Sequence, residues 1–229
     1  MSAEIPTHVG YIVDGNRRWA KQHGLPAYEG HLAGYNGLQD VLLETLNQGV
    51  TYASAYVFST ENWKRSQDEV SRLMRLILKI LTSDLHILQE KNVRLRVLGS
   101  REGMSDKIVK AINDGEEATK NNTAGTLALC INYGGQDEIV SAVKQIIAAG
   151  ISASDVTPEL IEQHLYAADI PPCDLIVRTS GEQRLSNFML WRSAYSELVF
   201  LDKNWPDMTK QDVTDILEEY KMRERRIGK

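Results

Sequence analysis

The feature that most constrains the fold of this 229-residue chain is the regular alternation of short β-branched runs with longer segments of helical periodicity. Such runs are typical of strands, and helices between them favour parallel pairing, because a parallel connection has to cross over the sheet. The predicted strands are His8–Val13, Thr51–Phe58, Val93–Leu98, Thr126–Ile131, Asp174–Val177 and Leu198–Leu201. The pattern therefore predicts the α/β class, with a six-stranded, mainly parallel sheet covered by helices on both faces.

The segments between the strands carry helix signals and no long linker, so residues 1–229 are predicted to form a single domain. Side chains that favour the first position before a helix precede each predicted helix. These helices cover Gln67–Lys91 after Ser66, Asp106–Lys120 after Ser105, and a segment that begins at Pro158 after Thr157.

The segment Val70–Leu88 is apolar nearly all round in its middle. A helix of this kind has to be buried on two sides, against the sheet on one side and against an apolar tunnel or a second subunit on the other. Core packing alone would also explain its composition. An apolar tunnel between the sheet and the helices is therefore one of two predictions that this segment supports.

Composition narrows the classes of partner. The chain carries 26 Lys and Arg against 31 Asp and Glu, a balance that argues against a nucleic-acid coat and against a polybasic membrane anchor. Cys130 and Cys173 lie far apart without a metal-binding or CxxC spacing, which favours a reducing compartment. The first ten residues do not resemble a signal peptide, and no stretch of about twenty apolar residues is present. We therefore expect a cytoplasmic protein.

A charged turn follows the first predicted strand. Asp14, Gly15, Asn16, Arg17 and Arg18 come at the start of a helix. Glycine allows a tight turn, the helix start offers free N–H groups, and arginine donors match phosphate oxygens. A carboxylate beside a phosphate site is unfavourable unless a divalent cation lies between them, which suggests Mg²⁺. The alternative is that Asp14 caps the helix and the arginines are solvated.

Two more polar turns follow predicted strands and would lie at the same edge of the sheet. Ser59–Arg65 contains Asn62, which can donate and accept, and a further arginine. Arg178–Phe188 places two arginines and two serines around a glycine. Two anion-binding turns at one sheet edge suggest two phosphorylated substrates, or one long substrate. The alternatives are an ordinary loop with an aromatic plug at Trp63, and surface ion pairs of Arg178 and Arg184 with Glu182 and Asp174.

Taken together, these segments resemble the cis-prenyltransferase family, whose bacterial members include undecaprenyl diphosphate synthase. The resemblance spans nearly the whole chain, which lacks the DDxxD element of the all-helical trans-prenyl synthases. It is carried by HVGYIVDGNRRWA, Gly30 with His31, YVFSTENWKR, NYGG at 132–135, DLIVRTSGEQRLSNFMLW, AYSELVF and the closing RRIG.

The resemblance implies a Mg²⁺-dependent condensation of isopentenyl diphosphate with an allylic diphosphate, with farnesyl diphosphate as the expected primer. Asp14 would be the essential carboxylate and would share the metal with Glu197, while Asn62 would help to organise proton loss. The proton acceptor is either a phosphate oxygen or a group near Asp14 and Asn62. The allylic diphosphate would be held by Gly15, Asn16, Arg17, Arg18, His31 and Arg65, and further substrate contacts would come from Trp19, Ser59, Trp63, Arg178, Arg184, Ser186, Arg226 and Gly228.

The family also implies a homodimer, in which the closing element around Arg226 and Gly228 reaches the neighbouring subunit's site. Undecaprenyl diphosphate for cell-wall (peptidoglycan) lipid carriers is the expected product, with peripheral membrane contact for its release at most. Val57 stands where long-chain members often carry Ala, and a bulkier wall would shorten the product. Arg17 and Ala27 depart from the bacterial pattern of Gly and Arg, and Gln183 replaces a frequent His.

Three alternatives to a long-chain synthase therefore stay open. A short-chain synthase of the Z-farnesyl type would perform the same chemistry and stop early. A non-catalytic partner subunit of another prenyltransferase is disfavoured, because Asp14, Asn62 and Arg178 are all intact. A phosphohydrolase with Asp14 as nucleophile is disfavoured because Asn16 stands where a second aspartate is needed.

Overall fold

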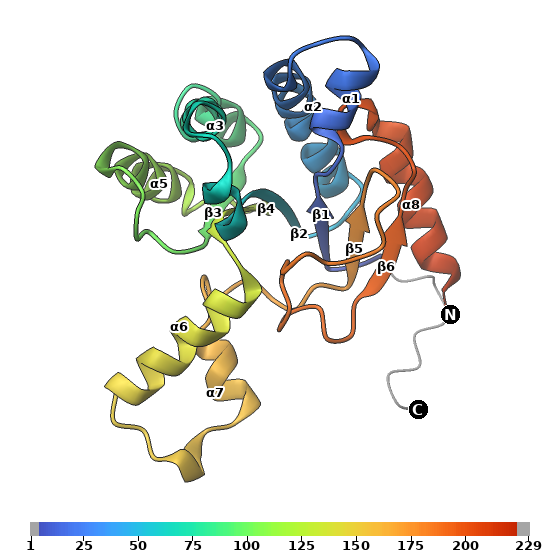
Figure 1. The fold of residues 1–229 in the computed structure, drawn as a ribbon. Helices are drawn as coiled ribbons and strands as arrows, with labels where there is room; N and C mark the ends of the chain where they lie inside the picture. The colour runs from blue at the N-terminus through green and yellow to red at the C-terminus, as the bar shows by residue number, and fades with distance from the viewer. Residues whose placement is uncertain (1–4, 224–229) are drawn as a thin grey trace.

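The chain is organised around one parallel sheet, as the sequence predicts. The structure is a computed structural model that describes residues 5–223. Its six strands lie in the order β3-β4-β2-β1-β5-β6, and every pairing between neighbours is parallel (Figure 1). The strands are β1 (His8–Ile12), β2 (Tyr52–Ser59), β3 (Val93–Leu98), β4 (Gly125–Tyr133), β5 (Leu175–Arg178) and β6 (Glu197–Phe200). All six predicted strands are confirmed, with ends that differ by at most two residues.

Helices connect the strands, and three single turns of 3₁₀ helix interrupt the loops. The α-helices are α1 (Asn16–Gln22), α2 (Ala27–Asn47), α3 (Gln67–Leu81), α4 (Leu85–Glu90), α5 (Asp106–Thr119), α6 (Gly135–Ala148), α7 (Pro158–Gln163) and α8 (Lys210–Met222). The 3₁₀ turns are η1 (Thr60–Lys64), η2 (Ala153–Asp155) and η3 (Trp205–Asp207). The predicted caps Ser66 and Thr157 are confirmed, since each side chain accepts a hydrogen bond from the backbone three residues on.

The single helix predicted over residues 67–91 is wrong, because α3 ends at Leu81 and α4 begins only at Leu85. The run Thr82–Asp84 separates them, and the Thr82 hydroxyl donates to the Leu78 carbonyl at 2.7 Å. Short polar side chains of this kind compete with the backbone for hydrogen bonds, so they favour turns over continuous helix.

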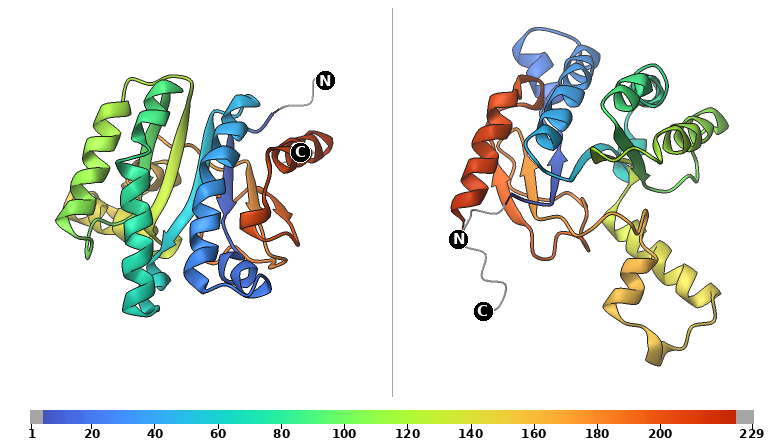
Figure 2. Two further views of the ribbon diagram at one scale, coloured as in Figure 1. Left: turned by 90° about the horizontal axis from the view of Figure 1, so that it is seen from above. Right: turned by 180° about the vertical axis from the view of Figure 1, so that it is seen from behind.

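The helices do not cover both faces of the sheet, which corrects a second prediction. Helices α2, α3, α4, α5 and α8 pack on one face, where the larger core lies (Figures 1 and 2). The other face is covered by loop segments before and after β5, through Ile170, Phe188 and Met189. Helices α6 and α7 pack on each other and extend away from the sheet.

A buried ion pair ties the first turn of α6 to the loops that cover that second face. The Glu138 carboxylate is fully buried, pairs with the buried guanidinium of Arg192, and accepts a hydrogen bond from the Tyr133 hydroxyl at 2.6 Å. Buried charges are tolerated when they are paired and hydrogen-bonded in this way. The outer side of α6 is left exposed.

The fold brings three polar turns to one edge of the sheet. Ile12 at the end of β1 lies beside Arg178 at the end of β5, and β2 lies on the other side of β1. The connections that follow β1 and β5 lead to strands on opposite sides of this pair. Such a reversal of strand order leaves a crevice at the carboxyl ends of the two strands, where ligands of open α/β sheets bind. The turns that begin at Asp14, Ser59 and Arg178 meet there.

The buried His8 on β1 predicts how stability depends on pH. Its ring nitrogens lie 2.6 Å from the Ser54 hydroxyl and 2.9 Å from the Pro171 carbonyl, and burial lowers its pKa from 6.5 to about 4. Between those values the unfolded chain binds one proton more than the folded chain. We therefore expect the free energy of unfolding to fall as pH drops from 6.5 toward 4, with about 3 kcal/mol from this residue.

Urea unfolding across that pH range measures the effect. The variant His8→Gln should show a shallower dependence, whereas the exposed His86→Gln should match the wild-type chain. His31, whose pKa is also lowered by burial, adds a slope of the same sign to every variant. An unchanged slope in His8→Gln would contradict the prediction.

Candidate active site

The turn after β1 is shaped by a glycine that no other residue can replace without strain. Gly15 has φ +100°, and a Cβ added there would lie 2.5 Å from the Asn204 side-chain oxygen. The Gly15 N–H donates to the Asp14 carboxylate at 2.8 Å, and the Thr179 hydroxyl donates to the Asp14 carbonyl at 2.6 Å. The Asp14 carboxylate is therefore held by the backbone of the next residue, and the Asp14 main chain is held by the turn after β5. Helix α1, which follows, has only seven residues.

An ion pair joins the ends of β1 and β5. Arg178 Nη2 lies 2.8 Å from Asp14 Oδ2, and the Arg178 side chain is only 4% exposed. Its Nη1 donates to the Ser186 hydroxyl at 2.8 Å. Among the described residues, Arg178 Nε is one of three buried side-chain polar atoms without a hydrogen-bond partner, together with Asn16 Oδ1 and Asn204 Oδ1. Buried donors of this kind are rare unless a ligand uses them, so Arg178 is suited to receive an anion.

A carboxylate that the sequence analysis did not single out gathers three of the predicted phosphate ligands. Glu69 in the first turn of α3 lies 3.1 Å from His31 Nε2, 2.9 Å from Arg65 Nη1 and 3.8 Å from Arg17 Nη1. Partial burial alone would raise the pKa of Glu69, but the His31 hydrogen bond and the two arginines hold it below its usual value. Burial lowers the pKa of His31, and Glu69 partly offsets this. The three predicted ligands are thus brought together.

Arg18 and Arg184 meet on a different carboxylate, that of Glu182. Arg18 donates to Ser180 and lies 2.7 Å from Glu182, and Arg184 lies 2.6 Å from the same side chain. Both arginines hold the pKa of Glu182 below its usual value. The surface ion pair considered for Arg184 is confirmed, whereas the proposed partner of Arg178 was wrong, because Asp14 takes that place.

The turn after β2 holds Asn62 at the same edge of the sheet. Its side-chain oxygen accepts from the Ser59 backbone N–H at 3.1 Å, which closes a capping box around η1. Trp63 instead donates to Asn132 at 2.7 Å and packs edge-on against Phe58. Asn62 lines the main cavity, while Trp63 lies outside it and is 39% exposed.

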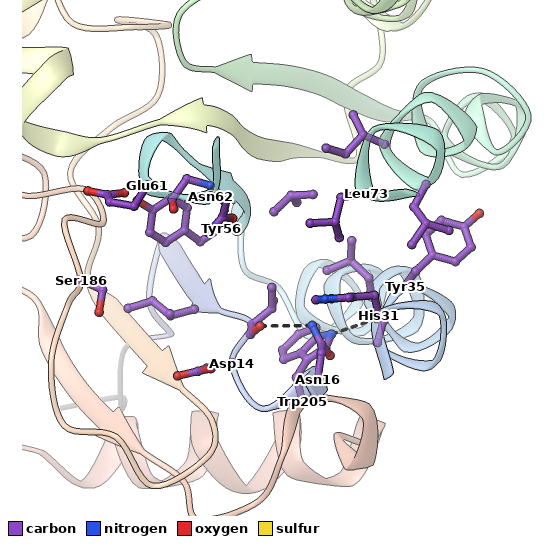
Figure 3. A pocket seen from close by; sticks show the side chains of 18 of the residues that line it. Asp14, Asn16, His31, Tyr35, Tyr56, Glu61, Asn62, Leu73, Ser186 and Trp205 are labelled. Carbon is purple, nitrogen blue, oxygen red and sulfur yellow. Dashed lines mark hydrogen bonds between the residues drawn. The ribbon is translucent and has the colours of Figure 1, made fainter. Parts of the chain in front are cut away.

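The main cavity, of about 580 Å³, is polar at one side and apolar at the other (Figure 3). Figure 3 shows Asp14, Asn62 and Ser186 at one side and Leu73 and Tyr35 at the other. The apolar wall is formed by Leu38, Val57, Leu73, Leu76, Ile77 and Ile80, so the helix predicted to be buried on two sides does face a cavity. Of the predicted site residues, the cavity is lined by Asp14, Asn16, His31, Ser59, Asn62, Arg65, Arg178 and Ser186.

A second cavity, with a larger volume of about 990 Å³, adjoins it beside α1. It contains the cations of Arg17, Arg18 and Lys21, and it shares Asp14 and Arg65 with the main cavity. Asp14 therefore lies between two positively charged regions. Gly15 also lines this second cavity.

Several predicted site residues are not brought to these cavities. Trp19 donates to Asp207 at 2.8 Å and stacks on His23. Glu197 begins β6 and pairs with Arg223 at 2.9 Å. The sheet register puts Glu197 level with Leu175, whereas Asp14 follows the opposite end of β1, about 16 Å further along the strands. Arg226 and Gly228 lie outside the described residues.

The donor set fits a magnesium ion only with help from a substrate. Among residues 5–223, no group of three or more His, Cys, Asp or Glu side chains could hold a metal. Mg²⁺ commonly takes one or two carboxylates and completes its shell with water and substrate phosphates. The carboxylate of Asp14, beside two regions rich in anion-binding side chains, fits that pattern, whereas a site shared with Glu197 does not form within one chain.

The sequence analysis did not identify several residues that line the main cavity or that pair with its predicted phosphate-binding side chains. Glu61 and Asn187 pair at 3.0 Å across the turns after β2 and β5, and Trp205 donates to the Gly34 carbonyl at 2.9 Å. The only signal for Glu61 and Asn187 was their position in the polar turns. Glu69 resembled an ordinary acidic residue in a first helical turn.

Known proteins resemble this chain over almost its full length. The isoprenyl transferase of Thermotoga maritima is 46% identical over 226 residues, which cover 98% of this chain and 97% of the relative. The trans,polycis-polyprenyl diphosphate synthase ((2Z,6E)-farnesyl diphosphate specific) of Thermobifida fusca is 47% identical over 228 residues, covering 98% of this chain and 81% of the relative.

Solved structures agree. The lavandulyl diphosphate synthase of Lavandula x intermedia, in complex with dimethylallyl diphosphate, superposes with a TM-score of 0.94 at 33% identity, covering 98% of this chain and 99% of that chain. A probable undecaprenyl diphosphate synthase of Campylobacter jejuni gives 0.83 at 32% identity, covering 99% of both chains. The family model described as "Putative undecaprenyl diphosphate synthase" matches residues 12–228, and the chain therefore belongs to the cis-prenyltransferase family.

Proposed function

We propose that this chain condenses isopentenyl diphosphate with an allylic diphosphate in the presence of Mg²⁺, and so builds a polyprenyl diphosphate with cis double bonds. The observation that carries the proposal is the main cavity, which runs from Asp14, Arg178 and Asn62 to an apolar wall between α2 and α3. A diphosphate with a hydrocarbon tail needs such a cavity, because its two ends require opposite surroundings.

Two diphosphates can be placed on either side of Asp14. We assign the allylic diphosphate to the region of Asn16, Arg17, His31 and Arg65, and isopentenyl diphosphate to Arg178 and Ser186. Cationic donors flank Asp14 on both sides, and Arg178 and Ser186 both line the main cavity. Binding both substrates at one edge of the sheet would align the allylic carbon with the attacking double bond.

Mg²⁺, held by Asp14 and substrate phosphate oxygens, would stabilise the negative charge of the departing diphosphate. Side chains of the protein would bind the leaving group, exclude water and orient the group that loses a proton. Arginine donors would bind the leaving diphosphate, the apolar wall would exclude water from the allylic carbon, and Asn62 would orient the group that loses a proton. The proton would pass to a phosphate oxygen or to a group near Asp14. Glu197 as a second metal ligand stays a prediction that only a neighbouring subunit could fulfil.

A short product is the second candidate that the cavity supports. Val57 lines the apolar wall, as expected for a residue that narrows the tunnel. The lavender neighbour is named a lavandulyl diphosphate synthase and was solved with dimethylallyl diphosphate, whereas the Thermobifida fusca relative is named a polyprenyl diphosphate synthase that is farnesyl diphosphate specific, so the names of the relatives include both a short and a long prenyl chain. Undecaprenyl diphosphate and a role in peptidoglycan precursor synthesis stay predictions. The presence of Asp14, Asn62 and Arg178 at one cavity also speaks against a non-catalytic partner subunit.

A homodimer through α6 is the assembly that the exposed surface favours. Val140, Val143 and Ile147 are 51%, 40% and 69% exposed and lie on one side of α6, which extends from the sheet. Apolar side chains at this spacing form a stripe that a second helix can cover.

A cytoplasmic location, with peripheral membrane contact at most, also stays a prediction. None of the helices within residues 5–223 has the length and apolar character needed to cross a membrane.

Replacement of Asp14 tests the central chemistry. We expect Asp14→Ala to reduce incorporation of labelled isopentenyl diphosphate onto farnesyl diphosphate by roughly 100-fold or more, because the carboxylate acts on charge that develops during reaction. Chelation should likewise abolish incorporation by the wild-type chain, and added Mg²⁺ should restore it. The exposed Asp40→Ala is the matched control and should keep wild-type activity. Full activity of Asp14→Ala would contradict the proposal.

The α6 surface makes a separate prediction about assembly. The wild-type chain should sediment as a dimer at micromolar concentration, and Ile147→Asp should shift it toward monomer, because a charge would have to be buried in the contact. Leu25→Asp, which alters an exposed apolar residue far from α6 in sequence, should leave the dimer intact. A wild-type monomer, or an unchanged dimer in Ile147→Asp, would refute this contact.

A further inference from the structure

The apolar side of the main cavity does not end at a closed wall. A second cavity of about 200 Å³ lies behind it, between α2, α4 and β4. The two cavities share Tyr35, Leu38 and Ile80 as lining residues. These three side chains therefore form the partition between a front cavity, which reaches Asp14, and a rear cavity, which does not.

Tyr35 is fixed in this partition by polar contacts that join two elements. Its hydroxyl donates to the carboxylate of Asp84, in the turn between α3 and α4, and Lys79 Nζ lies 4.9 Å from the centre of its ring. Burial and the neighbouring Asp84 carboxylate both raise the pKa of the Tyr35 hydroxyl above its usual value. Figure 3 shows Tyr35 at the side of the front cavity remote from Asp14 and Ser186.

The rear cavity can take hydrocarbon once the partition opens. Leu42, Leu88, Leu127 and Leu129 line it, and its polar lining residues include Asn36 and Gln39. It would add roughly a third to the volume of the front cavity. Since the front cavity holds the phosphate-binding side chains, the growing tail of a product would approach the partition from the Asp14 side.

We propose that Tyr35, tied to Asp84, stops growth of the prenyl chain and thereby sets the length of the product. This inference rests on the proposed function. A tail that advanced into the rear cavity would have to displace the Tyr35 ring and separate its hydroxyl from Asp84. Loss of this half-buried hydrogen bond costs free energy, and Lys79 would also lose its contact with the ring. Further elongation is therefore opposed by lost polar contacts as well as by bulk.

Product analysis of Tyr35 variants tests the inference. The chain is incubated with farnesyl diphosphate, labelled isopentenyl diphosphate and Mg²⁺, and the dephosphorylated products are separated by chromatography. Tyr35→Ala opens the partition, and we expect its main product to be longer by one or more isoprene units. Tyr35→Phe keeps the ring but removes the hydrogen bond to Asp84, so we expect a mixture of wild-type and longer products. Asp84→Ala should give the same mixture by removing the acceptor.

Two further variants separate the partition from a general loosening of α2. Tyr28→Ala removes another tyrosine of α2 that contacts a cation of α3, Arg72, at 5.1 Å, but Tyr28 lines neither cavity, and its products should match the wild type. Gln39→Phe fills the rear cavity. It should change nothing in the wild-type chain, and it should return the products of Tyr35→Ala toward wild-type length.

The outcomes distinguish this inference from the function on which it rests. Wild-type product lengths in Tyr35→Ala, Tyr35→Phe and Asp84→Ala, at normal incorporation of label, would overturn the role of Tyr35 and leave the proposed function standing. Longer products that Gln39→Phe fails to shorten would also overturn the rear cavity as their destination. No incorporation of label by the wild-type chain would overturn the proposed function itself.

Discussion

The ion pair between Asp14 and Arg178 is the contact on which the arrangement of the site depends. It joins the carboxyl ends of the neighbouring strands β1 and β5. Strand β2 lies on the other side of β1, and β6 lies on the other side of β5, so the chain continues from these two strands toward opposite edges of the sheet. Arg178 is buried, and Ser186 and Asp14 hold its two terminal nitrogens. Because one buried guanidinium contacts both turns, the acidic and the basic parts of the site keep a fixed separation. A shift of either strand would separate them.

Around this pair, the cations of the site are held by carboxylates on neighbouring elements. Glu69 gathers His31, Arg65 and Arg17, and Glu182 gathers Arg18 and Arg184. Each carboxylate lowers the cost of placing several positive charges side by side before a substrate arrives. A diphosphate with its metal ion would compete for the same donors. The protein thus keeps a strongly anion-binding edge on a chain whose net charge is −5.

Local patterns predicted the sheet and the three polar turns well, because β-branched runs and turn residues carry their own structural preferences. They did not predict contacts made by tertiary packing. The break after Leu81 depends on three short polar residues inside an otherwise helical pattern, and the roles of Glu69 and Tyr35 depend on the approach of α3 to α2. The metal site that the resemblance implies for Glu197 stays a prediction, because the sheet register puts Glu197 at the far end of the sheet from Asp14. One chain alone cannot bring these two carboxylates together.

The most direct test of the account is a crystal structure of the chain with Mg²⁺, isopentenyl diphosphate and an unreactive thio analogue of farnesyl diphosphate. The account predicts two diphosphates on either side of Asp14, one on Arg178 and one on the side of Arg65. It also predicts a hydrocarbon tail that lies between α2 and α3 and ends at Tyr35. Diphosphates bound away from the pair of Asp14 and Arg178, or a tail on the outer surface of α3, would contradict it.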